Sequence, residues 1–283
     1  MFVGIAHAAF KVTDMKASLH FYCDIAGMKH AFNLKDKDGK PWIEYLSFGG
    51  GQFVELFYGA EYTAEPAYDG KRIGYHHYCF ETKDMTGLAK RLFAEGLIQK
   101  ETIDFGVDGN RSCWAHDPDG NAVEFIQYYP ESPLVKDPPC SGRVSPGAGI
   151  AHIALRSKDW SKALAFYRDL LGFQLQWTLE RDGKPVIYYL LVRPGQIIEL
   201  YDGSTETLPP DQKRAGFSHV CIEVDDINAA AAYIEGKGVK LDSPPKRGVD
   251  MNYQAWVTDP DGNRIELMQI DPESPHAKAD AKA

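Results

Sequence analysis

The feature that most constrains this chain is an internal duplication. Three anchors recur in the same order: GIAHAAF and GIAHIAL at residues 4–10 and 149–155, DGKP at 38–41 and 182–185, and DPDGN at 117–121 and 259–263. Their spacing is nearly constant, and together they cover almost the whole chain. We therefore expect two copies of one folding unit rather than a single large domain.

A segment of linker-like composition lies between the two copies. Residues 129–147 are rich in Pro, Gly and Ser and show no apolar periodicity, as is typical of a linker. The predicted division is a first domain at 1–130, a linker at 131–148, a second domain at 149–272 and a tail at 273–283.

Each copy predicts two βαβββ modules. In the first copy an apolar strand over residues 4–12 precedes Asp14, a good helix N-cap, and a helix that closes at Gly27. Three strand-like runs follow, at residues 29–35, 42–48 and 52–58. Residues 74–127 repeat this order more loosely. The predicted fold class is therefore α+β, with four βαβββ modules in two domains.

Bulk properties narrow the class of protein. The chain has 283 residues, a formal net charge of −9 and a pI near 5.5, without a Lys/Arg cluster dense enough for nucleic acid or an anionic membrane. No apolar run approaches the roughly 18 residues of a spanning helix, and the five cysteines show no CxxC spacing. We expect a cytoplasmic monomer or homodimer with reduced thiols that binds a small molecule.

Each module offers one histidine near the start of its first strand and one glutamate on its last. The pairs are His7 with Glu55, His77 with Glu124, His152 with Glu199, and His219 with Glu266. We choose His77 over His76 because the second copy has Ser218 and His219 at these positions. A glutamate inside an apolar strand is costly to bury unless a cation or a hydrogen bond compensates its charge. Four matched pairs therefore indicate two four-ligand metal sites rather than hydrogen-bonded core residues.

The donor atoms limit the metal without identifying it. Imidazole nitrogens and carboxylate oxygens suit Zn, Ni, Co, Mn or Fe(II), and a mixed set with room for substrate favours a catalytic site. The pairing of modules is also open. His7 and Glu55 could join His77 and Glu124, or instead the corresponding pair of the fourth module.

The sequence around these residues resembles the vicinal oxygen chelate superfamily, which includes glyoxalase I, methylmalonyl-CoA epimerase, fosfomycin-modifying enzymes, extradiol dioxygenases and bleomycin-resistance proteins. The likeness lies in the strand and helix at residues 7–28 and 152–173 and in the DPDGN turns before Glu124 and Glu266. It implies a divalent metal that stabilises an enediolate as a Lewis acid, while a ligand glutamate moves the proton. We expect Glu124 or Glu266 to be this catalytic base.

Completeness of the ligand set ranks the family's reactions. His, Glu, His and Glu in both halves favour a glyoxalase-type isomerase, epimerase or lyase acting on a small α-hydroxycarbonyl or related substrate with vicinal oxygens. An extradiol ring-cleaving dioxygenase is the first alternative, but the histidine and tyrosine of its signature are missing here: Trp256 stands at the tyrosine position, and no histidine lies between His219 and His276. A non-catalytic binding or resistance protein is the second, and eight intact ligand candidates count against it.

Other repeated residues are candidates for substrate contact. Lys11 and Arg156 stand where glyoxalase I has a basic glutathione contact, but Gly59 and Gly203 replace its asparagine, so glutathione involvement is open. We expect four further residues to line the cavity mouths or, alternatively, to serve as turn and core residues: Asn110, Asn252, Trp114 and Trp256.

Besides His76, four histidines fall outside the repeated set. His20, His30 and His116 have no histidine counterpart in the other half, and we assign them surface or structural roles. His276 belongs to the Ala/Lys-rich tail.

Overall fold

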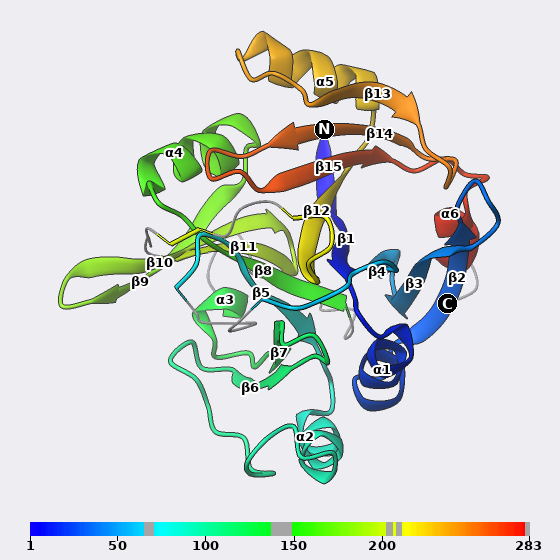
Figure 1. Cartoon of the computed structure of the whole chain (residues 1–283). Helices are drawn as coiled ribbons and strands as arrows, with labels where there is room; N and C mark the ends of the chain where they lie inside the picture. Colours follow the sequence, from blue (N-terminus) through cyan, green and yellow to red (C-terminus); the bar gives the residue numbers. More distant parts are fainter. Residues whose placement is uncertain (65–70, 137–148, 202–205, 208–210, 281–283) are drawn as a thin grey trace.

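The computed structural model describes residues 1–280 except 65–70, 137–148, 202–205 and 208–210. The described chain forms two mixed β-sheets, with the helices at the periphery (Figure 1). Cys23, Cys79, Cys113 and Cys221 carry free thiols, whereas Cys140 lies outside the described residues. No described helix is long and apolar enough to cross a membrane.

The first sheet has eight strands in the order β13-β14-β15-β12-β1-β4-β3-β2. Their bounds are β1 (Phe2–Lys11), β2 (Lys29–Lys35), β3 (Pro41–Gly49), β4 (Gln52–Phe57), β12 (Gly216–Val224), β13 (Ser243–Arg247), β14 (Tyr253–Thr258) and β15 (Arg264–Gln269). The sheet thus joins the first module of the chain to the fourth.

The second sheet has seven strands in the order β6-β7-β5-β8-β11-β10-β9. Their bounds are β5 (Gly74–Glu81), β6 (Arg111–His116), β7 (Ala122–Gln127), β8 (Gly149–Arg156), β9 (Gln174–Arg181), β10 (Lys184–Arg193) and β11 (Gln196–Tyr201). It joins the second module to the third. The predicted α+β class is confirmed, and the pairing that the sequence left open crosses between the two halves.

An aspartate caps each of the four module helices, as predicted for Asp14. The helices are α1 (Met15–Leu19) with its π-helical continuation η1 (His20–Ile25), α2 (Met85–Ala94), α4 (Trp160–Leu164) with η2 (Ala165–Leu170), and α5 (Ile227–Gly236). Each preceding Asp side chain accepts from first-turn backbone N–H groups that have no partner within the helix. Gly27 ends η1 with φ 90°, a conformation that glycine adopts without strain.

One apolar core is shared by both sheets. It includes Phe10 of β1 and Tyr78 of β5, whose rings meet edge to face at 4.6 Å. The predicted DPDGN turns tie the sheets together as well. The Tyr22 hydroxyl of the first module donates to buried Asp117 of the second at 2.9 Å, and Tyr167 donates likewise to Asp259 at 2.8 Å.

One short helix follows the last strand of the second module, and another follows the last strand of the fourth. α3 (Pro133–Lys136) comes after β7, and α6 (Pro275–Asp280) comes after β15. Both belong to segments expected to be linker or tail. The domain bounds drawn from composition stay a prediction, since each sheet is built from both halves of the chain.

Candidate metal centres

Two clusters of buried ligand-type side chains occupy the middle of the two sheets. We call His7, Glu55, His219 and Glu266 centre A, and His77, Glu124, His152 and Glu199 centre B. Each of the eight residues is at most 8% exposed. Each centre takes one His/Glu pair from each half of the chain.

Strand register brings the centre A side chains onto one face. Directly opposite residues of neighbouring strands point to the same side of a sheet. His7 of β1 lies opposite Cys221 of β12, which in turn lies opposite Glu266 of β15. Ala9 follows His7 by two residues on β1, and it lies opposite His219 of β12 on one side and Glu55 of β4 on the other. The four ligand candidates therefore surround two small residues, Cys221 and Ala9.

The second sheet repeats this arrangement. Cys79 of β5 lies opposite His152 and Glu124, and Ala154 of β8 lies opposite His77 and Glu199. Small residues at these positions leave space above the sheet for the longer side chains to converge. Ala9, Ala154, Cys79 and Cys221 were not singled out by the sequence, although the repeat of Ala9 as Ala154 was visible in it.

The spacing within centre A fits one cation. His7 Nε2 lies 3.1 Å from His219 Nε2 and 3.1 Å from the Glu266 carboxylate, which is 3.3 Å from His219 Nε2. The Glu55 carboxylate lies 3.5 Å from both imidazoles. Donor atoms that share a metal at roughly 2.0–2.2 Å are separated from one another by about 3.0–3.5 Å.

Centre B has a tighter core and one more distant carboxylate. His77 Nε2 lies 2.9 Å from His152 Nε2, and Glu124 lies 3.2 and 3.0 Å from these two atoms. Glu199 is 3.9 Å from His77 Nε2 and approaches His152 through Nδ1, at 3.6 Å. Three of the four groups already have the spacing of metal ligands.

Neighbouring groups orient the histidine rings. His76 Nδ1 lies 2.7 Å from His77 Nδ1, and the Ser218 hydroxyl lies 3.1 Å from His219 Nδ1. Each contact fixes one ring edge and turns Nε2 toward the cluster. The structure thus places His77 in the centre and its neighbour His76 behind it.

Burial sets the protonation of the centres. It lowers the pKa of His77 and of His219 to about 4, which keeps both imidazoles neutral and able to bind a metal near pH 7. It also raises the pKa of Glu55 and of Glu199 to about 7. Although burial opposes ionisation of Glu266, hydrogen bonds with His219 and His7 lower its pKa to about 2.

The donor set is consistent with a divalent metal site. Two carboxylates buried beside two imidazoles form a cluster whose charge a cation would compensate. The Nδ1 atoms of His7 and His152 are buried and have no hydrogen-bond partner. Cys221 is a further candidate at centre A, but burial raises its thiol pKa well above the usual value, so that the poorly ligating protonated form dominates.

Further aromatic groups flank both centres. A tyrosine lies beside one glutamate in each: Tyr45 lies directly opposite Glu55 in the sheet, and Tyr201 follows Glu199 by two residues on the same strand. The Trp114 and Trp256 rings, predicted at the cavity mouths, lie 4.4 and 4.8 Å from His77 and His219. Trp114 is 41% exposed, which leaves part of its ring open to solvent.

The other predicted substrate contacts are engaged within the protein. Asn110 and Asn252 are fully buried and hold the backbone N–H groups of Tyr129 and Asp271. Lys11 Nζ donates to Gln212 at 2.7 and 2.8 Å. The Arg156 guanidinium lies over the ring of Tyr201. Their contact with a substrate stays a prediction.

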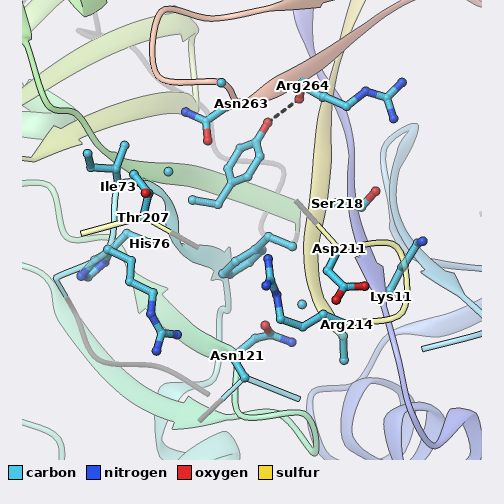
Figure 2. Close-up of a pocket in the computed structure, with 18 of the residues that line it drawn as sticks. Lys11, Ile73, His76, Asn121, Thr207, Asp211, Arg214, Ser218, Asn263 and Arg264 are labelled. Carbon is cyan, nitrogen blue, oxygen red and sulfur yellow. Dashed lines mark hydrogen bonds between the residues drawn. The ribbon is translucent and has the colours of Figure 1, made fainter. Parts of the chain in front are cut away.

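A basic pocket of about 390 Å³ lies where β5 and β12 begin (Figure 2). Its lining includes five Lys or Arg residues and two Asp residues: Lys11, Lys71, Arg72, Arg214, Arg264, Asp211 and Asp261. Asn121 and Asn263, from the two DPDGN turns, lie on opposite sides of it. His76 and Ser218 also line the pocket, so it reaches residues adjacent to a histidine of each centre.

His276 occupies a position that the sequence reasoning missed. It is 1% exposed, and its ring stacks on His7 of centre A with centroids 6.4 Å apart. Burial lowers its pKa to about 3. The signal was present, because PESP at residues 130–133 recurs at 272–275 immediately before Leu134 and His276.

The chain is similar to several characterised proteins. Residues 4–125 and 149–267 match the family model described as glyoxalase/bleomycin resistance protein/dioxygenase superfamily. Glyoxalase I of Saccharomyces cerevisiae is 26% identical, over 93% of this chain and 91% of that protein. Lactoylglutathione lyase of Schizosaccharomyces pombe is 25% identical, over 93% of this chain and 95% of that protein. Glyoxalase I from Zea mays shares the fold, with a TM-score of 0.70 and 23% identity over 94% of this chain and 92% of that one.

Proposed function

Because this chain belongs to the glyoxalase/bleomycin resistance protein/dioxygenase superfamily, we propose that it is a metal-dependent isomerase, epimerase or lyase of the glyoxalase type. Its substrate is a small α-hydroxycarbonyl or a related compound with two adjacent oxygens. One observation carries the proposal: each sheet holds a buried His/Glu/His/Glu cluster in which at least three of the four groups have the spacing of ligands around one cation. A simple binding protein would not need this set twice.

His7, His77, His152 and His219, with the four glutamates, would hold the metal. A divalent ion bound there would act as a Lewis acid toward the substrate carbonyl. The imidazoles of His77 and His219 are neutral near pH 7 and offer their Nε2 lone pairs without first losing a proton. Trp114 and Trp256 lie against these rings and restrict water around them.

A glutamate of each centre takes the proton α to the carbonyl and returns it to the neighbouring carbon. We assign this role to Glu266 in centre A and Glu124 in centre B. Each lies between both imidazoles of its cluster, within 3.3 Å of each. Glu55 and Glu199 are the competing candidates, because a pKa of about 7 suits a general base at neutral pH.

The basic pocket could bind the part of a substrate that lies beyond its two vicinal oxygens. Two relatives are named for glyoxalase I or lactoylglutathione lyase activity, and a glutathione adduct would bring carboxylates toward this pocket. Lys11 already donates twice to Gln212, and Gly59 replaces an asparagine contact of glyoxalase I. The proposal therefore admits two forms of the substrate, the free α-hydroxycarbonyl and its glutathione adduct.

Turnover with and without glutathione tests the proposal. Protein loaded in turn with Zn, Ni, Co, Mn and Fe(II) should isomerise α-hydroxycarbonyl substrates, including the hemithioacetal that an α-ketoaldehyde forms with glutathione, and a chelator should abolish the activity. Strict dependence on glutathione would restrict the substrate to its adducts. Oxygen uptake with catechols, together with no isomerisation, would instead establish the ring-cleaving alternative.

A further inference from the structure

The same short motif leads into both centres. PESP at residues 130–133 introduces α3, and PESP at residues 272–275 introduces α6. In each copy the motif's serine is fully buried, at Ser132 and Ser274. The residue after the motif is Leu134 in the first copy and His276 in the second. The two centres therefore receive different side chains at corresponding positions.

α6 inserts His276 beside centre A. Its imidazole lies within an aromatic group, with ring centroids 5.0, 4.9 and 5.0 Å from Phe32, Tyr45 and Phe53. Tyr45 lies directly opposite Glu55 in the sheet. His276 thus abuts residues that position a ligand candidate of this centre.

The hydrogen bonds of Asn252 fix the tautomer of His276. The Asn252 carbonyl oxygen accepts from the backbone N–H of Asp271 at 3.0 Å, which directs the amide nitrogen to the other side. That nitrogen donates to Asp250 at 2.6 Å and meets His276 Nδ1 at 2.9 Å. Nδ1 is therefore the acceptor, and the proton of the neutral ring resides on Nε2.

This Nε2–H is a buried donor without an acceptor. His276 Nε2 makes no hydrogen bond, and the same is true of two other buried atoms nearby, Asp250 Oδ1 and His7 Nδ1. Asp250 lies 3.7 Å from His276 Nδ1, and the His7 ring stacks on His276. Leaving a buried polar atom unpaired is costly, so native structures normally supply a partner. The position of these atoms favours a polar group that binds at centre A.

Centre B offers an apolar side chain instead. Leu134 is 2% exposed and packs with Ile187, Tyr189 and Ile197, against which Trp177 also lies. Tyr189 occupies the position of Tyr45, directly opposite Glu199. A hydroxyl placed against Leu134 would lose its hydrogen bonds to water, whereas a methyl group would not.

We propose that His276 and Leu134 are specificity-determining residues of the two centres, so that centre A favours a hydroxyl-bearing substituent next to the vicinal oxygens and centre B favours an apolar one. This inference rests on the proposed function, because it assumes that both centres bind substrate. His276 acts by donating Nε2–H to the substituent. It is neither a metal ligand nor a proton carrier.

Binding of glycerate and lactate tests the inference without turnover. These α-hydroxy acids present the same two vicinal oxygens and differ by a single hydroxyl. Calorimetry would be run on zinc-loaded full chain with only one centre intact, using His77→Ala to remove centre B and His219→Ala to remove centre A. Centre A should bind glycerate roughly three- to tenfold more tightly than lactate, the range expected of one hydrogen bond.

Exchange of the two residues provides matched variants. In the centre A background His276→Leu should abolish the preference while zinc content stays unchanged, and His276→Gln, which keeps an N–H donor, should restore part of it. In the centre B background Leu134→His should create a preference for glycerate. An unchanged glycerate to lactate ratio in His276→Leu overturns the inference, as does loss of zinc from both His276 variants.

Failure of the proposed function gives a different pattern. If isomerase activity is absent but the glycerate preference follows His276, the inference holds for a binding site and the enzymatic proposal fails alone. If turnover is present and the preference ignores His276, only the inference fails.

Discussion

At the scale of single residues, the two glutamates of each centre are not equivalent. In centre A, Glu266 lies within 3.3 Å of both imidazoles and its pKa falls to about 2, whereas Glu55 lies 3.5 Å from both and its pKa rises to about 7. One carboxylate is stabilised by its imidazole partners, while burial dominates for the other. A bound divalent cation would favour the ionised form of both carboxyls. Substitution of each glutamate then tests which one transfers the proton.

Glu266→Gln should separate metal binding from proton transfer. In the His77→Ala background, where centre A is the intact one, we expect kcat to fall by roughly 100-fold or more while bound metal is retained, because an amide can ligate but cannot accept the proton. Steady-state kinetics with elemental analysis measures both effects. Glu55→Gln is the matched control. A larger loss of kcat in Glu55→Gln than in Glu266→Gln would transfer the role to Glu55.

Metal affinity should rise with pH. A carboxyl with a pKa of about 7 still holds a proton at pH 6, and a metal must displace that proton from Glu55 or Glu199 before binding. Affinity should therefore increase from pH 6 upward, by up to roughly tenfold per pH unit for each proton displaced from these carboxyls or from His7 and His152, whose pKa values the neighbouring glutamates raise despite burial. Competition with a chromophoric chelator measures it. A flat profile would show that these carboxyls are already ionised without metal.

At the scale of secondary-structure elements, strand register makes the centres. β1 and β12 run antiparallel between two parallel neighbours, and Ala9 has His219 on one side and Glu55 on the other. β8 repeats the pattern with Ala154 between His77 and Glu199. A small side chain between two ligands is a geometric requirement, because a larger one would fill the space where the donor atoms converge.

Enlarging these alanines should close the centres selectively. Ala9→Leu is expected to remove the metal of centre A and to leave that of centre B, and Ala154→Leu should do the reverse. Both alanines are fully buried, so the overpacked variants should also lose about 1–3 kcal/mol of unfolding free energy. Metal analysis and urea denaturation measure the two effects. Full metal content in a folded Ala9→Leu variant would show that the space above this residue is not needed.

The sequence predicted the helices, strands and turns well, because each depends on residues that are close together in the chain. Asp14 caps its helix, Gly27 ends it, and the DPDGN turns form as expected. The pairing of modules was not readable, because it depends on packing between segments far apart in the chain, such as Phe10 against Tyr78. His276 was placed in a tail because its surroundings in sequence are small and polar. Its burial depends on aromatic residues more than 200 positions away.

At the scale of the whole molecule, the duplicated halves exchange modules. In each sheet the first strand of a module from one half of the chain pairs with the first strand of a module from the other half. These pairs are β1 with β12 and β5 with β8. The shared core and the bonds of Tyr22 and Tyr167 to the DPDGN turns hold the two sheets together. Neither half supplies a complete centre by itself. The central claim is therefore that each metal centre is assembled from both halves of the chain.

Metal stoichiometry in two double variants tests this claim most directly. His7→Ala with His219→Ala removes two ligands of one centre, whereas His7→Ala with His77→Ala removes one ligand from each. We predict that the first variant keeps about one of two bound metals per chain and the second keeps almost none, with His20→Ala as an exposed histidine control that keeps both. If the His7/His77 variant retained one metal and the His7/His219 variant retained none, each centre would belong to one half of the chain, and the account would be wrong.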